Sequence, residues 1–333
     1  MSDEIIKLLV PGHKIAITSH FNPDGDAIGS SLGLGLSLRK AGLNASVIVP
    51  NEYPEFLHWL PGNESVLIYE KEAEKVKEVL SQADVIFCLD YNSPKRVGGM
   101  EDTLRSSRGV KILIDHHLEP DLAFFNHVFS RLETSSTAEL VYEFIYNSGL
   151  LKEIDHDIAV CFYTGIMTDT GSFSYACNYE NTFRIVADLM KWKIDAEKIH
   201  RLIYDTFSES RLRLLGFCLR EKLTVLQDFA TAYMWLTRDE LNMFNFQPGD
   251  TEGIVNYALS IKGIRFAAMF IERDDKIRIS FRSTGDFSVN EFARKHFLGG
   301  GHRNAAGGDS YDTMEHTLQR FSDLLQDYIH QLL

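Results

Sequence analysis

The first half of the chain alternates short apolar runs with segments of helical periodicity. Each apolar run has the length of a buried strand, and the segments between them repeat their apolar positions as helices do. Strand and helix in alternation predict a parallel sheet with right-handed crossovers, and therefore an α/β fold. The predicted strands are Lys14–Thr18, Ser46–Val49, Asp84–Leu89 and Lys111–Ile114, and the predicted helices include Ile28–Ala41, Lys71–Ser81 and Thr137–Asn147.

The second half has a different pattern. Residues 181–219 are helical throughout, and Phe207–Arg220 is typical of a connecting helix. Further strands follow, partly joined by hairpin signals such as Asp274-Asp275, and Met314–Leu333 has the periodicity of an amphipathic helix docked on a domain. These strands are Lys222–Leu226, Thr231–Leu236, Ile264–Glu272 and Lys276–Phe281.

The length of 333 residues suggests two domains. We expect an N-terminal parallel-sheet α/β domain over residues 1–194 and a helical linker over 195–221. A smaller α+β domain is expected over 222–333. An active-site cleft is expected between the two domains, which is a common location for a ligand.

The composition of the chain argues against several classes of protein. The chain has 34 Lys and Arg against 47 Asp and Glu, a formal net charge of −13. This charge disfavours a surface for long nucleic acid, but a small anionic substrate could still bind in a local basic pocket. The four cysteines lack CxxC spacing, which argues against disulfides or a zinc cluster. Neither a signal peptide nor an apolar run of ~18–20 residues is visible, so a cytoplasmic protein without a membrane partner is expected.

Acidic and imidazole side chains follow three of the predicted strands. Functional groups of an open parallel sheet collect at the carboxyl ends of its strands, so these side chains are expected to converge. They are His20, Asp24 and Asp26 after the first run, Asp90 after the third, and Asp115, His116 and His117 after the fourth, with Asp169 after a helical apolar stretch as a further candidate.

Such a gathering of carboxylates predicts a metal site. Carboxylates this close would repel one another unless cations lay among them. Oxygen and imidazole donors without thiolate suit Mn²⁺, Co²⁺ or Mg²⁺ better than structural zinc. At least four carboxylates and two histidines exceed what one ion requires, so we expect two ions, as is typical of phosphoester hydrolysis.

Each of these residues also has a structural interpretation when taken alone. His20 or His116 could be a strand-end histidine with satisfied hydrogen bonds. Asp24-Gly25-Asp26 could form a turn and cap a helix. Asp115 could orient a neighbouring imidazole, a role that we retain for it. The metal hypothesis depends on the recurrence of the same chemistry after three strands.

The second domain contributes a candidate anion site. Arg282 lies at the end of a predicted strand, and Gly299–Gly301 form a run in which successive backbone amides could make a nest for a phosphate. Arg282 could add a bidentate contact and His302 another donor. The alternative is a flexible turn before a packed Ala-Ala-Gly segment.

Together these motifs resemble those of the DHH phosphoesterase family and its associated C-terminal domain. The resemblance covers nearly the whole chain, and its four spaced motifs followed by a glycine-rich signature are more specific than the DHH triplet alone. The motifs are His20-x-Asn22-x-Asp24-x-Asp26, Asp90, Asp115-His116-His117 and Asp169, followed by Phe281-Arg282-Ser283 and Gly299-Gly300-Gly301-His302-Arg303-Asn304-Ala305-Ala306-Gly307.

The resemblance implies a role for each residue. His117 would face the scissile phosphate, Asp115 would support the histidines, and Asp90 would bridge the two ions as a catalytic residue. The first ion would be held by His20, Asp24 and Asp90, and the second by Asp26, Asp90, His116 and Asp169. Substrate would be contacted by Arg96, Arg282, Ser283, Gly300, Gly301 and His302.

Within the family, the chain is most similar to the nanoRNase and pAp phosphatase type. This similarity implies a Mn²⁺-dependent hydrolase that degrades very short oligoribonucleotides and dephosphorylates 3′-phosphoadenosine 5′-phosphate (pAp). A dinucleotide phosphodiesterase, an inorganic pyrophosphatase and a non-catalytic nucleotide sensor stay open as alternatives, and so does a homodimer. Phe21, Phe173 and Tyr175 could stack on a base or belong to the core.

Overall fold

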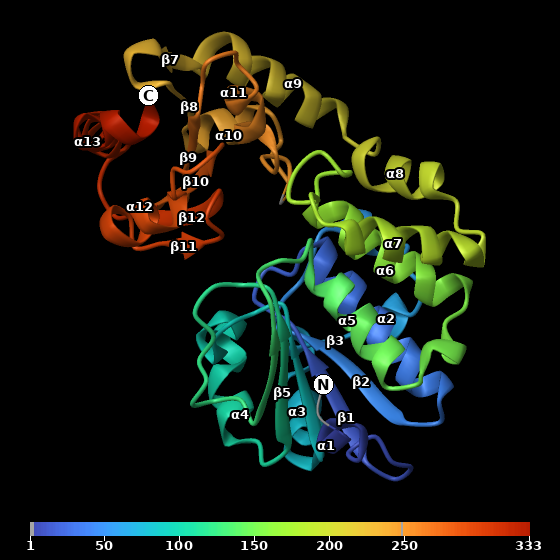
Figure 1. The fold of residues 1–333 in the computed structure, drawn as a ribbon. Coiled ribbons are helices and arrows are strands. Elements are labelled where there is room, and N and C mark those ends of the chain that lie inside the picture. Colours follow the sequence, from blue (N-terminus) through green and yellow to red (C-terminus); the bar gives the residue numbers. More distant parts are fainter. Residues whose placement is uncertain (1–2, 248) are drawn as a thin grey trace. The chain divides into compact units, whose positions relative to one another are not determined.

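The structure is a computed structural model that describes residues 3–247 and 249–333 (Figure 1). The chain forms two compact units, Met1–Thr206 and Phe207–Leu333. The boundary falls within the segment 195–221, whose role as a linker stays a prediction, as do the domain limits and the cleft between the domains.

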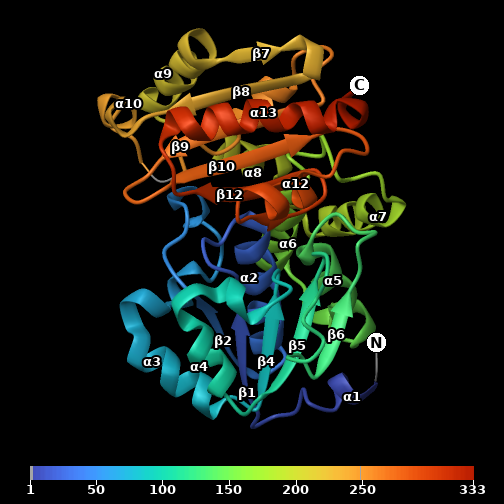
Figure 2. The same cartoon turned by 90° about the vertical axis from the view of Figure 1, so that its left-hand side faces the viewer.

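The first unit is built on a six-stranded sheet in which every neighbouring pair of strands is parallel. The strand order is β3-β2-β1-β4-β5-β6, and Figure 2 shows β2, β1, β4, β5 and β6 side by side in this order. The predicted α/β fold is confirmed. The strands are β1 (Lys14–Thr18), β2 (Asn44–Val49), β3 (Leu67–Ile68), β4 (Val85–Leu89), β5 (Val110–Asp115) and β6 (His127–Ser130).

Helices cover both faces of this sheet because alternate side chains of each strand point to opposite sides. Ile15 and Ile17 of β1 belong to one apolar core with α2, α5 and α6, whereas Ala16 belongs to a second core with α3 and α4. Figure 1 shows α4 and α5 on opposite sides of the sheet. These helices are α2 (Gly25–Lys40), α3 (Tyr69–Gln82), α4 (Glu101–Ser106), α5 (Thr137–Asn147) and α6 (His156–Asp169).

Glycines allow α2 to approach α6 closely. A Cβ atom on Gly25 would lie 2.4 Å from the Thr168 side chain, and one on Gly29 would lie 2.6 Å from the backbone oxygen of Cys161. The start of α2 therefore packs against the end of α6. This packing brings together two segments that carry predicted site residues, Asp26 and Asp169.

The remaining helices agree with the prediction that residues 181–219 contain no strand, and the structure describes all of these residues. In α8 (Ala196–Tyr204), Ile199 and Ile203 are buried in the first unit's core. The other elements here are α7 (Glu180–Leu189), η5 (Met190–Trp192), α9 (Glu209–Phe217) and the π-helical turn η6 (Cys218–Lys222). Elsewhere the first unit has α1 (Asp3–Ile6), η1 (Glu55–Leu57), η2 (Asn63–Ser65), η3 (Pro94–Met100) and η4 (Leu151–Glu153).

The second unit contains a mixed six-stranded sheet with the order β11-β12-β10-β9-β8-β7. Strands β8 and β9 are parallel, and the other neighbours are antiparallel, including the predicted β9–β10 hairpin. The strands are β7 (Thr224–Leu226), β8 (Thr231–Leu236), β9 (Phe266–Glu272), β10 (Ile277–Ser283), β11 (Gly300–Gly301) and β12 (Ala305–Ser310), with η7 (Gln227–Phe229) between β7 and β8.

Each face of the second sheet has its own core. One is rich in phenylalanine and includes Phe266, Phe281, Phe292 and Phe321, whereas the other joins β8 and β9 to α9, α10 and α11. Figure 2 shows α13 in front of this sheet, as the amphipathic pattern predicts. The helices are α10 (Arg238–Met243), α11 (Ile254–Leu259), α12 (Val289–His296) and α13 (Met314–Leu332). Among the residues that the structure describes, no helix combines the length and apolar character needed to span a bilayer.

The glycine contact between α2 and α6 can be tested by substitution. Gly29→Ala would place a methyl group against the α6 backbone, which cannot rotate away as a side chain can, so we expect a loss of about 1–3 kcal/mol in the free energy of unfolding. Urea denaturation followed by circular dichroism measures this loss. Gly216→Ala in α9 is the control, because its Cβ would meet no atom within 4 Å, and it should raise stability by about 0.5–1 kcal/mol. Equal stability of the two variants would contradict the close contact.

Candidate metal centre

The predicted acidic and imidazole residues of the first unit meet at the carboxyl edge of its sheet. Strands β1, β4 and β5 are neighbours, so the residues that follow them leave the sheet side by side. His20 lies two residues after β1, Asp90 directly follows β4, and Asp115 is the last residue of β5. The side chains form three groups, and within each group the possible ligand atoms lie within 4.8 Å of one another. The groups are His20, Asp24 and Asp90; Asp26, His116 and Asp169; and Asp90, Asp115 and His117.

The first group surrounds the His20 imidazole. Its Nε2 atom lies 3.4 Å from Asp90 Oδ2 and 3.8 Å from Asp24 Oδ2. The other ring nitrogen, Nδ1, is 2.9 Å from the backbone oxygen of Phe21 and donates its proton there. This bond leaves Nε2 as the lone-pair atom of the neutral ring, on the side of the two carboxylates, which is the usual arrangement of a metal-binding histidine.

The second group surrounds the His116 imidazole. Its Nε2 atom lies 3.4 Å from Asp90 Oδ1, 3.5 Å from Asp169 Oδ2 and 3.9 Å from Asp26 Oδ2. Asp90 thus presents one oxygen to each histidine, which is the arrangement that a carboxylate bridging two ions requires. Asp90 also has a φ of +64°. A left-handed backbone is uncommon outside glycine and tends to occur at functional sites.

Asp24 both caps a helix and belongs to the candidate metal site, as its sequence context allows. Its Oδ1 atom caps α2 by accepting hydrogen bonds from the backbone amides of Asp26 (3.0 Å) and Ala27 (3.1 Å). Its Oδ2 atom is the one that lies near His20. The helix cap therefore fixes the orientation of the carboxylate.

The N-terminus of α5 holds two further carboxylates. The backbone amides of Thr137 and Ala138 donate to Asp26 Oδ2 (2.7 Å) and Oδ1 (2.8 Å), and the Thr137 hydroxyl donates to Asp90 Oδ1 (2.9 Å). No motif in the sequence indicates this role for Thr137. The nearest signal is the start of a predicted helix at that residue, which does not indicate what the helix faces.

The third group joins Asp90 to Asp115 and His117. Asp115 is fully buried, and its Oδ1 atom lies 2.6 Å from His117 Nδ1. This hydrogen bond fixes the orientation and the tautomer of the His117 ring. The arrangement is the one expected if Asp115 orients a neighbouring imidazole.

The charges in this cluster favour the binding of cations. Burial raises the pKa of Asp26, and the charges of Asp90 and Asp169 raise it further. Burial also raises the pKa of Asp169, to about 7. Burial lowers the pKa of His20, but hydrogen bonds to Asp24 and Asp90 outweigh this effect and raise it to about 10. Without a metal the cluster therefore holds protons, and its oxygen and imidazole donors fit divalent cations that would replace them.

Arg96 is positioned through its main chain. The amide of Phe21 donates to the backbone oxygen of Arg96 at 2.7 Å, so η3 lies against the loop that follows His20. The Arg96 side chain is exposed. Of the aromatic candidates, Phe173 packs with Tyr163 and Phe183 in the core region, whereas Phe21 and Tyr175 are 41% and 53% exposed.

The candidate residues of the second unit lie on and beside β10 and β11. Arg282 is in β10 and is partly exposed, whereas Ser283 is buried and its hydroxyl donates to the Phe287 backbone oxygen. His302 directly follows β11, and its amide donates to the Ala305 backbone oxygen. These residues share one region of the second unit.

The prediction of a nest of exposed amides is wrong for two of its three glycines. The Gly299 amide donates to the Ala293 backbone oxygen, and the Gly301 amide donates to Asn290 Oδ1. A Cβ atom on Gly299 would lie 1.9 Å from the Gly307 oxygen. The glycines therefore permit close pairing of β11 with β12, and the Ala-Ala-Gly segment is a strand.

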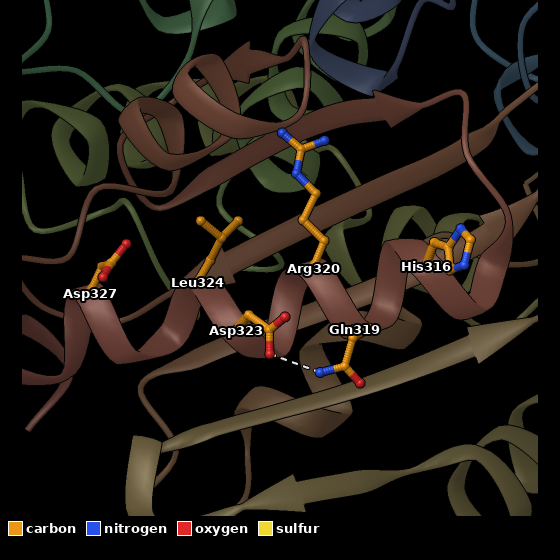
Figure 3. Close-up of a pocket in the computed structure, with 6 residues that line it drawn as sticks. All are labelled: His316, Gln319, Arg320, Asp323, Leu324 and Asp327. Atoms are coloured by element: carbon orange, nitrogen blue, oxygen red, sulfur yellow. Dashed lines mark hydrogen bonds between the residues drawn. The ribbon is translucent and has the colours of Figure 1, made fainter.

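A shallow hollow on the surface of α13 is separate from these candidates (Figure 3). Asp323 and Asp327 line it together with Arg320, and Gln319 donates a hydrogen bond to Asp323. Its mixed charges do not select an anion such as a phosphate. No residue predicted for the site lines this hollow.

Comparison with known proteins identifies the family. Residues 14–166 match the DHH family, N-terminal domain, and residues 228–331 match the DHHA1 domain. The chain is 32% identical over 294 residues to the bifunctional oligoribonuclease and PAP phosphatase NrnA of Thermus thermophilus, covering 88% of this chain and 83% of the relative. The chain belongs to the DHH phosphoesterase family.

Two further comparisons cover almost all of this DHH phosphoesterase. It is 29% identical over 317 residues to the bifunctional oligoribonuclease and PAP phosphatase NrnA of Bacillus subtilis, covering 93% of this chain and 94% of the relative. The crystal structure of an exopolyphosphatase-related protein from Bacteroides fragilis has a TM-score of 0.95 and 43% identity, covering 99% and 96% of the two chains. The protein is a hydrolase that acts on phosphate esters, and the resemblance inferred from its motifs is confirmed.

Divalent cations are expected to stabilise this DHH phosphoesterase. Mn²⁺ at 100 times its dissociation constant should raise the free energy of unfolding by about 2.7 kcal/mol, measured by urea denaturation of EDTA-treated protein with and without the ion. Asp90→Asn should lose most of this gain, because it removes the negative charge between His20 and His116, while asparagine still tolerates the left-handed backbone. The control is Asp102→Asn, an exposed acid on α4, which should keep the full gain. Equal stabilisation of both variants would rule out Asp90 as a ligand.

Proposed function

We propose that this phosphoesterase uses divalent metal, with Mn²⁺ as the first choice, to hydrolyse very short oligoribonucleotides to mononucleotides and pAp to AMP. The observation that carries this proposal is the similarity to two relatives named as bifunctional oligoribonucleases and PAP phosphatases, which extends over most of each chain. The clustered donors at the sheet edge support the metal requirement. The net charge of −13 supports short substrates over long strands.

Two ions are proposed, with Asp90 between them. When bound, they would supply Lewis-acid activation of water and neutralise charge on the phosphate. The geometry supports this division because each Asp90 oxygen lies nearest a different histidine. The proposed ligands of the first ion are His20, Asp24 and Asp90, and those of the second are Asp26, Asp90, His116 and Asp169.

His117 is proposed as the catalytic side chain that contacts the scissile phosphate. Asp115 binds its Nδ1 atom, so Nε2 is the ring atom assigned to the substrate. An imidazole whose proton is shared with a buried carboxylate can carry positive charge, which stabilises the negative charge that develops during hydrolysis. Asp115 contributes by positioning and needs no contact with substrate.

The proposed substrate contacts come from both units. Arg96 is exposed beside the His20 loop and can bind a phosphate group through its guanidinium. In the second unit the proposed contacts are Arg282, Ser283, Gly300 and His302, whereas the Gly301 amide already donates to Asn290 Oδ1. Arg282 is the strongest of these because its charge pairs with a phosphate, whereas the Ser283 hydroxyl is already engaged within the unit.

A substrate panel tests the proposal directly. The purified protein is incubated with Mn²⁺ and, separately, with a dinucleotide, a pentanucleotide, pAp, a cyclic dinucleotide and pyrophosphate. We expect mononucleotides from the short RNAs and AMP from pAp, measured by chromatography. Turnover confined to the cyclic dinucleotide or to pyrophosphate would replace the proposal with the corresponding alternative. Calorimetric binding without turnover of any compound would indicate a nucleotide sensor.

Arg282 is expected to act in substrate binding. Arg282→Ala removes one partner of a charged contact, so it should weaken binding of pAp by about 2–4 kcal/mol, seen as a higher KM. Arg278→Ala is a matched control, because Arg278 occupies the same face of β10 four residues earlier. It should leave KM unchanged. A lower kcat with unchanged KM in Arg282→Ala would show that Arg282 does not anchor the substrate.

A further inference from the structure

Glu139 is a buried acid in the first turn of α5 that belongs to none of the proposed ligand groups. Its side chain is fully buried. Burying a carboxylate is costly unless hydrogen bonds replace its hydration. Glu139 meets this requirement with four hydrogen bonds, so its place in the structure is specific.

These hydrogen bonds come from two segments of the chain. Glu139 Oε2 accepts from the Ser135 amide (3.1 Å), the Ser135 hydroxyl (2.6 Å) and the Thr182 hydroxyl (2.6 Å). Its Oε1 atom accepts from Asn181 Nδ2 (3.1 Å). Ser135 precedes α5, whereas Asn181 and Thr182 belong to the first turn of α7. Glu139 therefore ties the start of α5 to α7.

An acid at this helix position usually forms a capping box with the residue at the N-cap. Here the N-cap Ser136 accepts from the Glu139 amide in the usual way, but the Glu139 carboxylate bonds one residue further back, at Ser135. The bond to α7 is also no part of a capping box. Capping the helix alone would require neither the hydrogen bonds of Glu139 to Ser135 and to α7 nor the full burial of its side chain.

We call the hydrogen bonds of Glu139 to Ser135, Asn181 and Thr182 the clamp. The residues between Ser135 and Glu139 are the ones that contact the candidate metal centre. Thr137 and Ala138 lie between Ser135 and Glu139, and their amides donate to both oxygens of Asp26. The Thr137 hydroxyl donates to Asp90. Any shift of the chain at 135–138 would therefore rotate two carboxylates at once.

We propose that Glu139 is a positioning residue of the metal centre, which holds the first turn of α5 so that Thr137 and Ala138 keep Asp26 and Asp90 in their metal-binding orientation. This inference rests on the proposed metal-dependent function. It assigns Glu139 no contact with metal or substrate, and its effect passes through hydrogen bonds to the carboxylates.

Glu139→Gln is the variant that tests the inference. The two possible amide orientations place an NH₂ group either against the Ser135 amide or against Asn181 Nδ2, so each orientation sets donor against donor. Residues that orient ligands in this way typically change metal affinity by 10–100-fold, and we expect Mn²⁺ to bind about 10–100-fold more weakly. Electron paramagnetic resonance titration of free Mn²⁺ measures the dissociation constant without substrate.

Glu143→Gln is the matched control. Glu143 lies one turn further along α5 and also accepts from Asn181, as well as from Arg131, but no hydrogen bond joins it to residues 134–138 in the part of the chain that the structure describes. Its Mn²⁺ dissociation constant should stay within about twofold of the wild-type value. An equal dissociation constant for Glu139→Gln, Glu143→Gln and the wild type would overturn the inference.

Hydrogen–deuterium exchange of the metal-free protein separates this inference from the proposed function. Exchange at residues 135–138 should be faster in Glu139→Gln and unchanged in Glu143→Gln, and unchanged exchange in both would overturn the clamp. Failure of the wild type to bind Mn²⁺ would refute the proposed function, while the exchange result would still decide the clamp. If Glu139→Gln does not fold, Thr182→Val removes one donor to Glu139, and an unaltered dissociation constant in that variant would likewise overturn the inference.

Discussion

Repulsion among carboxylates is the constraint on which the candidate site depends. Asp24 is fixed by the cap of α2 and Asp26 by two amides of α5, while Asp90 is fixed by the Thr137 hydroxyl, so these side chains cannot simply move apart. Their negative charge must be balanced where they stand, by protons or by cations. Burial, and to a smaller extent the charges of Asp24 and Asp90, raise the pKa of Asp169, which likewise favours a proton or a cation at this carboxylate. The fold thus holds these carboxylates close together, in an arrangement that favours the binding of cations.

The packing of helices supplies the last member of this cluster. Asp169 does not follow a strand, and it reaches the sheet edge because α6 ends where α2 begins. This contact depends on Gly25 and Gly29, whose missing side chains leave room for Thr168 and the α6 backbone. The geometry of the site therefore depends on Gly25 and Gly29, which have no functional group that could bind a metal or a substrate.

Most of this architecture could be predicted because apolar runs of strand length alternate with segments of helical periodicity. The boundaries of β1, β8 and α5 agree with prediction residue for residue, whereas β3 has two residues and β12 is rich in alanine and glycine, so neither has the pattern of a strand. The strand-end residues could be recognised as a cluster because parallel strands end at one edge. The hydrogen bonds from Thr137 to Asp26 and Asp90 span 111 and 47 residues, and no local pattern indicates them.

Two kinds of buried acid in the first unit show why residue type alone does not assign a role. Glu139 and Asp26 are both buried in the same region, and both accept backbone amides. Glu139 is surrounded by hydroxyl and amide donors, and the Arg131 guanidinium lies 3.9 Å from its Oε1 atom, so protein groups alone balance its charge. Asp26 instead lies beside Asp90 and Asp169, whose charges oppose its own. The surroundings of the two carboxylates therefore differ in the donors and charges that they supply, and this difference appears only when the chain is folded.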